Sequence, residues 1–122
     1  NGGLEGTADD DGNICTGYNA EDESTYCNTQ DFVERVNAKG LCGANDWRLP
    51  DLNDLQSIVH FGKNWPAIDE NFFPNTDNLF YWSSSPHANP SNGAWVVYFV
   101  NGRDTSDNRS NDNPVRLVRS GQ

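Results

Sequence analysis

The run Tyr81-Trp82-Ser83-Ser84-Ser85 contains the side chains that come closest to a hydrolytic nucleophile. A serine acts as a nucleophile when a base lies within hydrogen-bonding reach, and many hydrolases place it in a G-x-S-x-G turn. No such turn surrounds these serines, and no motif links His60 or His87 to them. We therefore expect no hydrolase triad and no enzymatic activity.

The three cysteines, Cys15, Cys27 and Cys42, are the next candidates for chemistry. Their spacing matches no paired C-x-x-C zinc motif, and no motif ties a histidine to them. We favour a disulfide between Cys15 and Cys27, with Cys27–Cys42 as the alternative. In its Gly-Leu-Cys-Gly run, Cys42 is expected to be a small buried thiol. A disulfide is typical of secreted or surface-exposed proteins.

Acidic clusters at Asp9–Asp11 and Glu21–Glu23 could hold calcium, but they lack the spacing of an EF-hand loop. We expect solvated acidic loops and no cofactor, with a structural Ca²⁺ ion as the alternative.

The net charge of −10 over 122 residues is unevenly distributed. Residues 1–70 hold 14 acidic and 4 basic residues, whereas residues 71–122 hold four of each. This balance argues against nucleic acid or an anionic membrane surface as partner, because phosphate binding needs a basic footprint. No apolar run approaches the roughly 20 residues of a spanning helix, and no signal peptide is recognised, so we expect a mature or excised domain.

Two helices are expected to position these side chains. The first begins at Thr29, whose hydroxyl can cap it, and ends at Lys39 and Gly40, with an apolar stripe of Phe32, Val33 and Val36. The second has Asp51 as its N-cap and Asp54 three residues on, in capping-box fashion. Its buried face consists of Leu52, Leu55, Ile58 and Val59.

Strands are expected at residues 79–83, 94–100 and 115–119, where apolar residues alternate, with Asn101-Gly102 as a hairpin turn. Residues 1–26 read as an extended acidic arm. Residues 60–78 read as an irregular segment held by Trp65, Pro66, Phe72, Phe73 and Pro74. Helices followed by antiparallel strands indicate one α+β domain over residues 1–122, with a β-rich region at 79–119.

The Asp46-Trp47-Arg48 run could be a binding cluster, but Trp47 is more simply a core anchor and Arg48 the partner of a carboxylate. A second group of polar residues is the better binding candidate, because short hydrogen-bonding side chains on loops between fixed strands form an adaptable surface. The alternative is an inert solvated loop. The candidate ligand-binding residues are Ser85, His87, Asn89, Ser91, Asn92, Tyr98, Asn101, Arg103, Thr105, Asp107, Asn108, Arg109, Asn111 and Asn113.

An ordered set of motifs across the chain resembles the bacterial domain family typified by the C-terminal domain of the Legionella collagen-like adhesin. The motifs are GLCGANDWRLP at 40–50, PAID at 66–69, FPNT at 73–76, YWSSSP at 81–86, Ala94-Trp95 and VRLVR at 115–119. The resemblance implies a C-type lectin-like fold, similar to that of the formylglycine-generating enzymes. Members are mostly cell-surface or secreted adhesins, and the Legionella-type domain is associated with sulfated glycosaminoglycans. The related enzymes use catalytic cysteines late in the chain, and this sequence has none after Cys42.

Some members of this family are targets of diversity-generating retroelements, which randomise template adenines while copying into a C-terminal variable region. An AAC or AAT codon randomised in this way never encodes Glu, Gln, Lys, Met or Trp. Residues 71–121 contain no Glu, Gln, Lys or Met. The resemblance thus implies a variable region near the C-terminus, with Trp82 and Trp95 as fixed scaffold. Turn-rich β structure, which favours Asn, Asp, Ser and Gly, is the alternative explanation.

The leading hypothesis is therefore a non-enzymatic ligand-binding domain of a surface or secreted protein, with a protein or glycan as partner and no nucleic acid or membrane insertion. One alternative is a carbohydrate- or glycosaminoglycan-binding lectin, calcium-assisted through Asp104, Asp107 and Asp112. The other is a structural oligomerisation domain.

Overall fold

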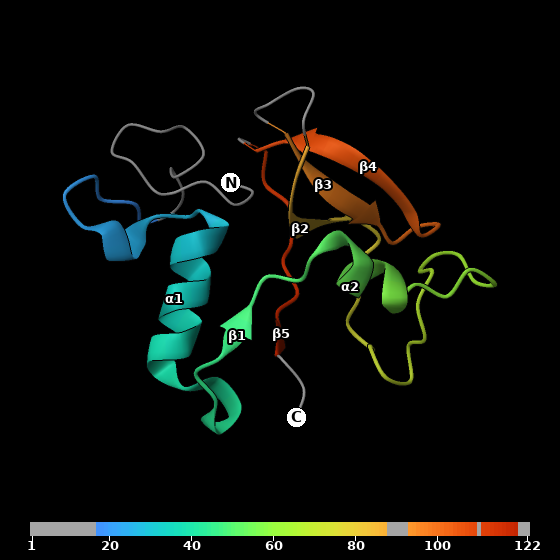
Figure 1. The fold of residues 1–122 in the computed structure, drawn as a ribbon, viewed down its shortest axis with the longest axis horizontal. Coiled ribbons are helices and arrows are strands. Elements are labelled where there is room, and N and C mark those ends of the chain that lie inside the picture. Colours follow the sequence, from blue (N-terminus) through green and yellow to red (C-terminus); the bar gives the residue numbers. More distant parts are fainter. Residues whose placement is uncertain (1–16, 88–92, 110, 120–122) are drawn as a thin grey trace.

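The computed structural model describes residues 17–87, 93–109 and 111–119. Over these residues, two α-helices and two short 3-10 helices accompany a two-stranded sheet (β1-β5) and a three-stranded sheet (β2-β3-β4), both antiparallel (Figure 1). The architecture confirms an α+β domain of two helices and small antiparallel sheets. No helix in the described residues is long and apolar enough to cross a membrane.

Helix α1 (Thr29–Lys39) lies where the sequence predicts it, but its cap is one residue earlier. Asn28 has extended backbone, and its side chain accepts a hydrogen bond from the Asp31 amide at 2.9 Å. Thr29 is helical and buried, so its hydroxyl is not the cap. Gly40 ends the helix in the left-handed region, as expected, because a residue without Cβ adopts that conformation at little cost.

Helix α2 (Leu52–Ser57) confirms the predicted capping box. The Asp51 side chain accepts from the Asp54 amide at 2.8 Å, and the Asp54 side chain accepts from the Asp51 amide at 3.0 Å. Leu55 is fully buried, and the other predicted residues of this face pack around the same cluster. The helix lies against the three-stranded sheet, whereas α1 stands beside β1 (Figure 1).

The three-stranded sheet consists of β2 (Phe80–His87), β3 (Gly93–Tyr98) and β4 (Arg103–Asn108). Strand β2 runs four residues beyond the predicted end, and β3 ends before Phe99. Strand β4 corrects the prediction of a loop after the hairpin turn: its sequence, RDTSDN, has no apolar alternation. It forms because β3 supplies a complete register, from Gly93↔Asn108 to Tyr98↔Arg103.

Strand β3 is the centre of the core because both of its faces are covered. Val97 belongs to a cluster with α2, and the neighbouring Val96 belongs to a second cluster on the opposite face. The buried members of the first cluster are Leu55, Ile68, Tyr81, Val97 and Phe99, and those of the second are Trp82, Ala94 and Val96.

The two-stranded sheet pairs β1 (Trp47–Arg48) with β5 (Val118–Arg119), so the last strand is shorter than predicted. Trp47 is only half-buried and is not the expected core anchor. Its indole Nε1 donates to the Leu41 carbonyl at 3.0 Å, so it fixes the turn after α1. Arg48 is paired with a carboxylate, Asp54, at 2.7 Å, as predicted.

The structure contradicts two of the cysteine predictions and leaves the third untested. Cys42 lies in the 3-10 helix η3 (Leu41–Gly43) with a free, exposed thiol, so the expectation of a buried thiol and the alternative Cys27–Cys42 pairing are both wrong. Its neighbours are a surface turn, which supplies no apolar wall. Cys15 lies outside the described residues, so the Cys15–Cys27 bridge stays a prediction.

Two expectations about irregular segments also need correction. The described part of the predicted arm, residues 17–26, is not extended: it carries the 3-10 helix η2 (Glu23–Thr25), and Tyr26 is buried. The segment between α2 and β2 is irregular, as expected, but Trp65, Phe72 and Pro74 are exposed and do not hold it. Pro66 and its two successors are buried instead.

Replacement of Gly102 tests how tightly the β3–β4 turn fits the core. Gly102 has φ +79°, and a Cβ there would clash with Val59 Cγ1. We expect Gly102→Ala to lower the free energy of unfolding by about 2 kcal/mol or more, measured by urea denaturation. Gly40→Ala is the matched control, because φ is +63° with nothing within 4 Å of the added Cβ. Equal losses in the two variants would contradict the close packing of the turn.

Candidate binding surface at the open end of the sheet

The predicted ligand-binding residues separate to the two ends of the three-stranded sheet. His87, Gly93 and Asn108 are register partners at one end, which we call the open end and which also includes the described residues 109 and 111–113. Tyr98 and Arg103 pair at the other end, five residues along β3 and therefore about 17 Å away. The predicted set does not form one surface. Asn89, Ser91 and Asn92 lie outside the described residues.

At the far end, which we call the turn end, the predicted residues mainly support the hairpin. The Tyr98 ring packs on Phe80 with centroids 4.5 Å apart. Asn101 Oδ1 accepts from the Arg103 amide at 3.0 Å, as is common for Asn in tight turns. Arg103 itself is exposed. Thr105 lies midway along β4, half-buried opposite Val96, and belongs to neither end.

At the open end, Asp107 organises the segment that follows β4. Its Oδ1 accepts from Asn111 Nδ2 at 2.7 Å and from the Asn108 amide at 2.9 Å. Its Oδ2 accepts from Asn113 Nδ2 at 2.8 Å. Asp107 is thus an internal acceptor that joins Asn108, Asn111 and Asn113, and hydrogen bonds to a charged acceptor are the stronger ones.

Two further predicted residues complete the open end. The His87 ring meets the half-buried Trp95 ring edge-on, with centroids 4.6 Å apart. Arg109 Nε donates to the Gly93 carbonyl at 3.1 Å and so closes the end of β3. The open end therefore combines a pair of aromatic rings with polar side chains that are joined through Asp107.

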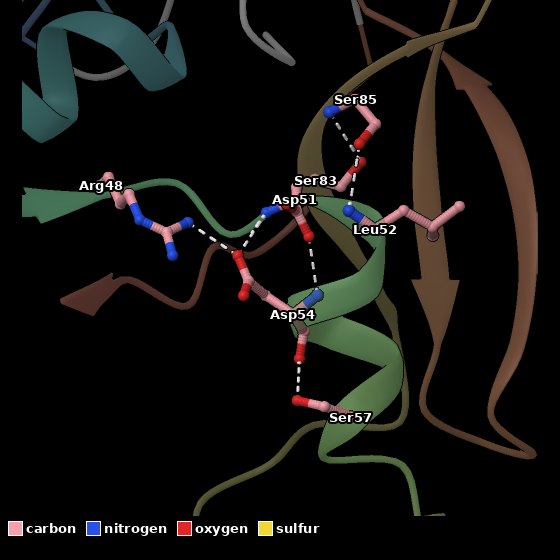
Figure 2. A network of polar contacts seen from close by, with 7 residues as sticks. All are labelled: Arg48, Asp51, Leu52, Asp54, Ser57, Ser83 and Ser85. Carbon is pink, nitrogen blue, oxygen red and sulfur yellow. Dashed lines mark hydrogen bonds and ion pairs between the residues drawn. The ribbon is translucent and has the colours of Figure 1, made fainter. Parts of the chain in front are cut away.

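Ser85, by contrast, has a structural contact that its sequence position did not reveal (Figure 2). Its Oγ accepts from the Leu52 amide at 3.0 Å, and its own amide donates to Ser83 Oγ at 3.1 Å. Ser83 Oγ in turn donates to the Trp95 carbonyl at 2.7 Å. The pairing of β2 with β3 is irregular between Trp82 and Pro86, and the serines of this bulge join β2 to the start of α2.

One ion pair, between Arg48 of β1 and Asp54 of α2, ties the small sheet to α2 (Figure 2). A hydrogen bond from Arg48 is the main reason that the pKa of Asp54 lies below its usual value, with the Asp51 amide as the second cause. Asp46 pairs with Arg119 at 2.7 Å, and this contact lowers the pKa of Asp46. A carboxyl group whose pKa is lower in the folded than in the unfolded state stabilises the fold at neutral pH. This contribution to the free energy of unfolding is lost as the pH falls below about 4.

A cavity of about 540 Å³ adjoins the Asp107 network, and sequence reasoning missed it. Its lining includes Phe32 and Arg35 from α1, Trp82 from β2, and the segment Asp112–Val115. Asn113 both lines the cavity and donates to Asp107, so the network shapes one wall. The volume lies in the range of small-molecule sites. No local sequence signal marks it, because its walls come from distant parts of the chain.

The acidic residues of the calcium alternative do not converge. Asp104 and Asp107 are three residues apart on β4 and therefore project from opposite faces of the sheet. Among the described residues, no group of three His, Cys, Asp or Glu side chains could hold a metal ion. The cluster Asp9–Asp11 lies outside the described residues.

Fold and site together define a small α+β domain with a structured polar end beside a cavity. A family model described as Lcl C-terminal domain matches residues 7–119. Because the match covers nearly the whole chain, the protein belongs to this family of adhesin-associated domains, as its motifs predicted. Neither the curated proteins nor the solved structures that were compared give a match.

Removal of the Asp107 carboxylate tests its organising role. We expect Asp107→Ala to lower the free energy of unfolding by about 1–2 kcal/mol, because three donors lose their acceptor. Amide resonances of residues 108–113 should shift in the NMR spectrum. Asp112→Ala is the control: this side chain is exposed, so its loss should stay within about 0.5 kcal/mol. Equal effects of the two variants would contradict the assignment.

Proposed function

We propose that this chain is a non-enzymatic ligand-binding domain of a surface or secreted adhesin, of C-type lectin-like type, and that it binds through the open end of its three-stranded sheet. The observation that carries this proposal is the Asp107 network, which ties the side chains of Asn111 and Asn113 together beside the cavity. A surface that is already ordered loses less entropy when a ligand binds, so binding is stronger.

The composition of the open end supports the same function. The edge-on His87–Trp95 pair supplies a rigid aromatic contact, and the exposed Asn108 and Asp112 supply adaptable hydrogen bonds. Rigid aromatics combined with short polar side chains are typical of binding surfaces that accept varied partners. Residues 71–122 carry four acidic and four basic residues, so this half of the chain has no formal net charge. Long-range electrostatic attraction therefore contributes little to the choice of ligand.

The serines and cysteines carry no nucleophilic role in this proposal. Ser83 and Ser85 take part in hydrogen bonds that join β2 to β3 and α2. With the Cys42 thiol free, the proposal assigns the disulfide to Cys15 and Cys27, which suits an oxidising, extracellular location.

The proposal extends to diversification of the C-terminal region by a retroelement. Its support is the absence of Glu, Gln, Lys and Met from residues 71–121. Trp82, which adenine randomisation cannot produce, is fully buried under the cavity, as a fixed scaffold residue should be.

Sequencing of the DNA around the coding region tests diversification. We expect a nearly identical repeat downstream that differs from the coding copy only at adenines, beside a reverse transcriptase gene. The adenine-derived differences should fall in the codons of exposed residues such as Asn108 and Asp112. A locus without such a repeat would contradict diversification by a retroelement. The absence of Glu, Gln, Lys and Met would then be explained by turn-rich β structure.

A second candidate function is binding of sulfated glycans. A groove of about 340 Å³ brings together Arg48, Arg116 and Arg119, which sequence reasoning did not group. Arg48 and Arg119 are neutralised by their aspartates. Arg116 donates to Thr76 at 2.8 Å and has no carboxylate within ion-pair distance among the described residues, so it supplies the net positive charge.

A glycan array of neutral and sulfated sugars, together with an array of surface proteins, separates these candidates. We expect Asn108→Ala and Asp112→Ala to lower the bound signal about fivefold or more, because each removes a hydrogen-bonding side chain from the open end. Arg103→Ala, at the turn end, should leave it unchanged, and so should EDTA. A signal on sulfated glycans that falls only in Arg116→Gln would favour the groove and contradict binding at the open end.

A further inference from the structure

Three large aromatic side chains project from the segment between α2 and β2. Phe61, Trp65 and Phe72 are 77%, 71% and 78% exposed. A single exposed apolar residue needs no explanation, but three within a dozen residues are unusual for a protein whose core is small. Each ring leaves most of its surface in water, so the rings do not shield one another. The segment lies away from the open end and is independent of the function proposed for that surface.

The backbone of this segment is firmly attached to the core. The amides of Trp65 and Ala67 donate to the carbonyls of Val100 and Phe99 at 2.9 and 2.7 Å. The His60 amide donates to the Ala67 carbonyl at 2.9 Å and closes the loop. Ala67 and Ile68 are fully buried. The backbone that carries Phe61 and Trp65 is therefore anchored to the core and does not belong to a frayed loop.

Trp65 adopts a backbone conformation that bulky residues rarely take. Its φ is +59°, in the left-handed region. Such a conformation persists only where the surrounding contacts enforce it, and residues of this kind cluster at active sites and ligand clamps. Here it coincides with an indole that is largely exposed.

The charges around the rings are mostly negative. Lys63 Nζ lies 3.6 Å from Glu70 Oε2. This ion pair joins the part of the segment that carries Phe61 and Trp65 to the part that carries Phe72. The segment from 60 to 79 contains Asp69, Glu70 and Asp77 but only one lysine. Glu70 is paired with Lys63, but its side chain is 54% exposed, so its carboxylate can accept from a second cation. The net charge of −10 adds long-range attraction for a cation.

We propose that Phe61, Trp65 and Phe72, together with Glu70, form a docking surface for an arginine- or lysine-rich polypeptide segment. A guanidinium or ammonium group is attracted to the face of an exposed indole or phenyl ring, and a neighbouring carboxylate pairs with the same cation. An anionic membrane or nucleic acid would be repelled by the acidic residues. A neutral polysaccharide would use the rings but gain nothing from the charge.

Titration with an N-acetylated peptide that alternates arginine and glycine tests this proposal, with the glutamate–glycine peptide as control. We expect the indole N–H resonance of Trp65 to shift on addition of the arginine peptide, while those of Trp82 and Trp95 stay in place. Trp65→Ala should weaken binding about fivefold or more, and Trp65→Phe should restore most of it. Glu70→Gln should weaken binding about two- to fivefold and reduce its salt dependence.

Matched variants elsewhere separate specific docking from attraction to an acidic protein. Glu34→Gln removes an exposed carboxylate on α1, and Leu41→Ala removes a half-exposed apolar side chain after it. Both should bind the peptide like the unmodified chain. The proposal is overturned if Glu34→Gln weakens binding as much as Glu70→Gln, or if Trp65→Ala binds normally. It is also overturned if dextran, but not the arginine peptide, shifts the Trp65 resonance. Phe72→Ala is the second variant if Trp65→Ala does not fold.

Discussion

The burial of β3 on both faces is the constraint on which the rest of this structure depends. Only about a third of the 122 residues are hydrophobic, so the chain can build only a small core. It does so by placing Val97 against α2 and Val96 against Trp82, which makes one strand the shared member of two clusters. The polar β4 forms as a strand because β3 is fixed and offers it a complete set of hydrogen-bonding partners.

This arrangement explains why the two surfaces proposed for binding lie apart. The β3–β4 turn packs closely on Val59 and Ala67, so the segment from 60 to 68 is attached to that end of the sheet and presents its aromatics there. Among the described residues, no comparable segment is hydrogen-bonded across the opposite end. Asp107, His87 and Arg109 order it through their own contacts, and a cavity remains between it and α1. A domain of this size can thus carry two surfaces whose substitutions act independently.

Much of the fold could be predicted because its signals are local. The capping box of α2, the glycine that ends α1 and the Asn-Gly hairpin turn each depend on residues a few positions apart. The candidate site was predicted only in part. Asp107, Asn111 and Asn113 were included in one predicted polar set, but the hydrogen bonds that join them were not foreseen. Ser85 was expected at the surface, yet its partner Leu52 is 33 residues away.

The amino-acid sequence by itself determined the class of fold, the positions of both helices, the family and the uneven charge, because propensity, caps and motifs are properties of short stretches. Only the tertiary structure decided which aromatics are core and which are exposed. Trp82 and Trp65 are the same residue type, but one finds Ala94 and Val96 across the sheet while the other turns outward. That difference depends on partners brought together by chain folding, and no local pattern records which residues those will be.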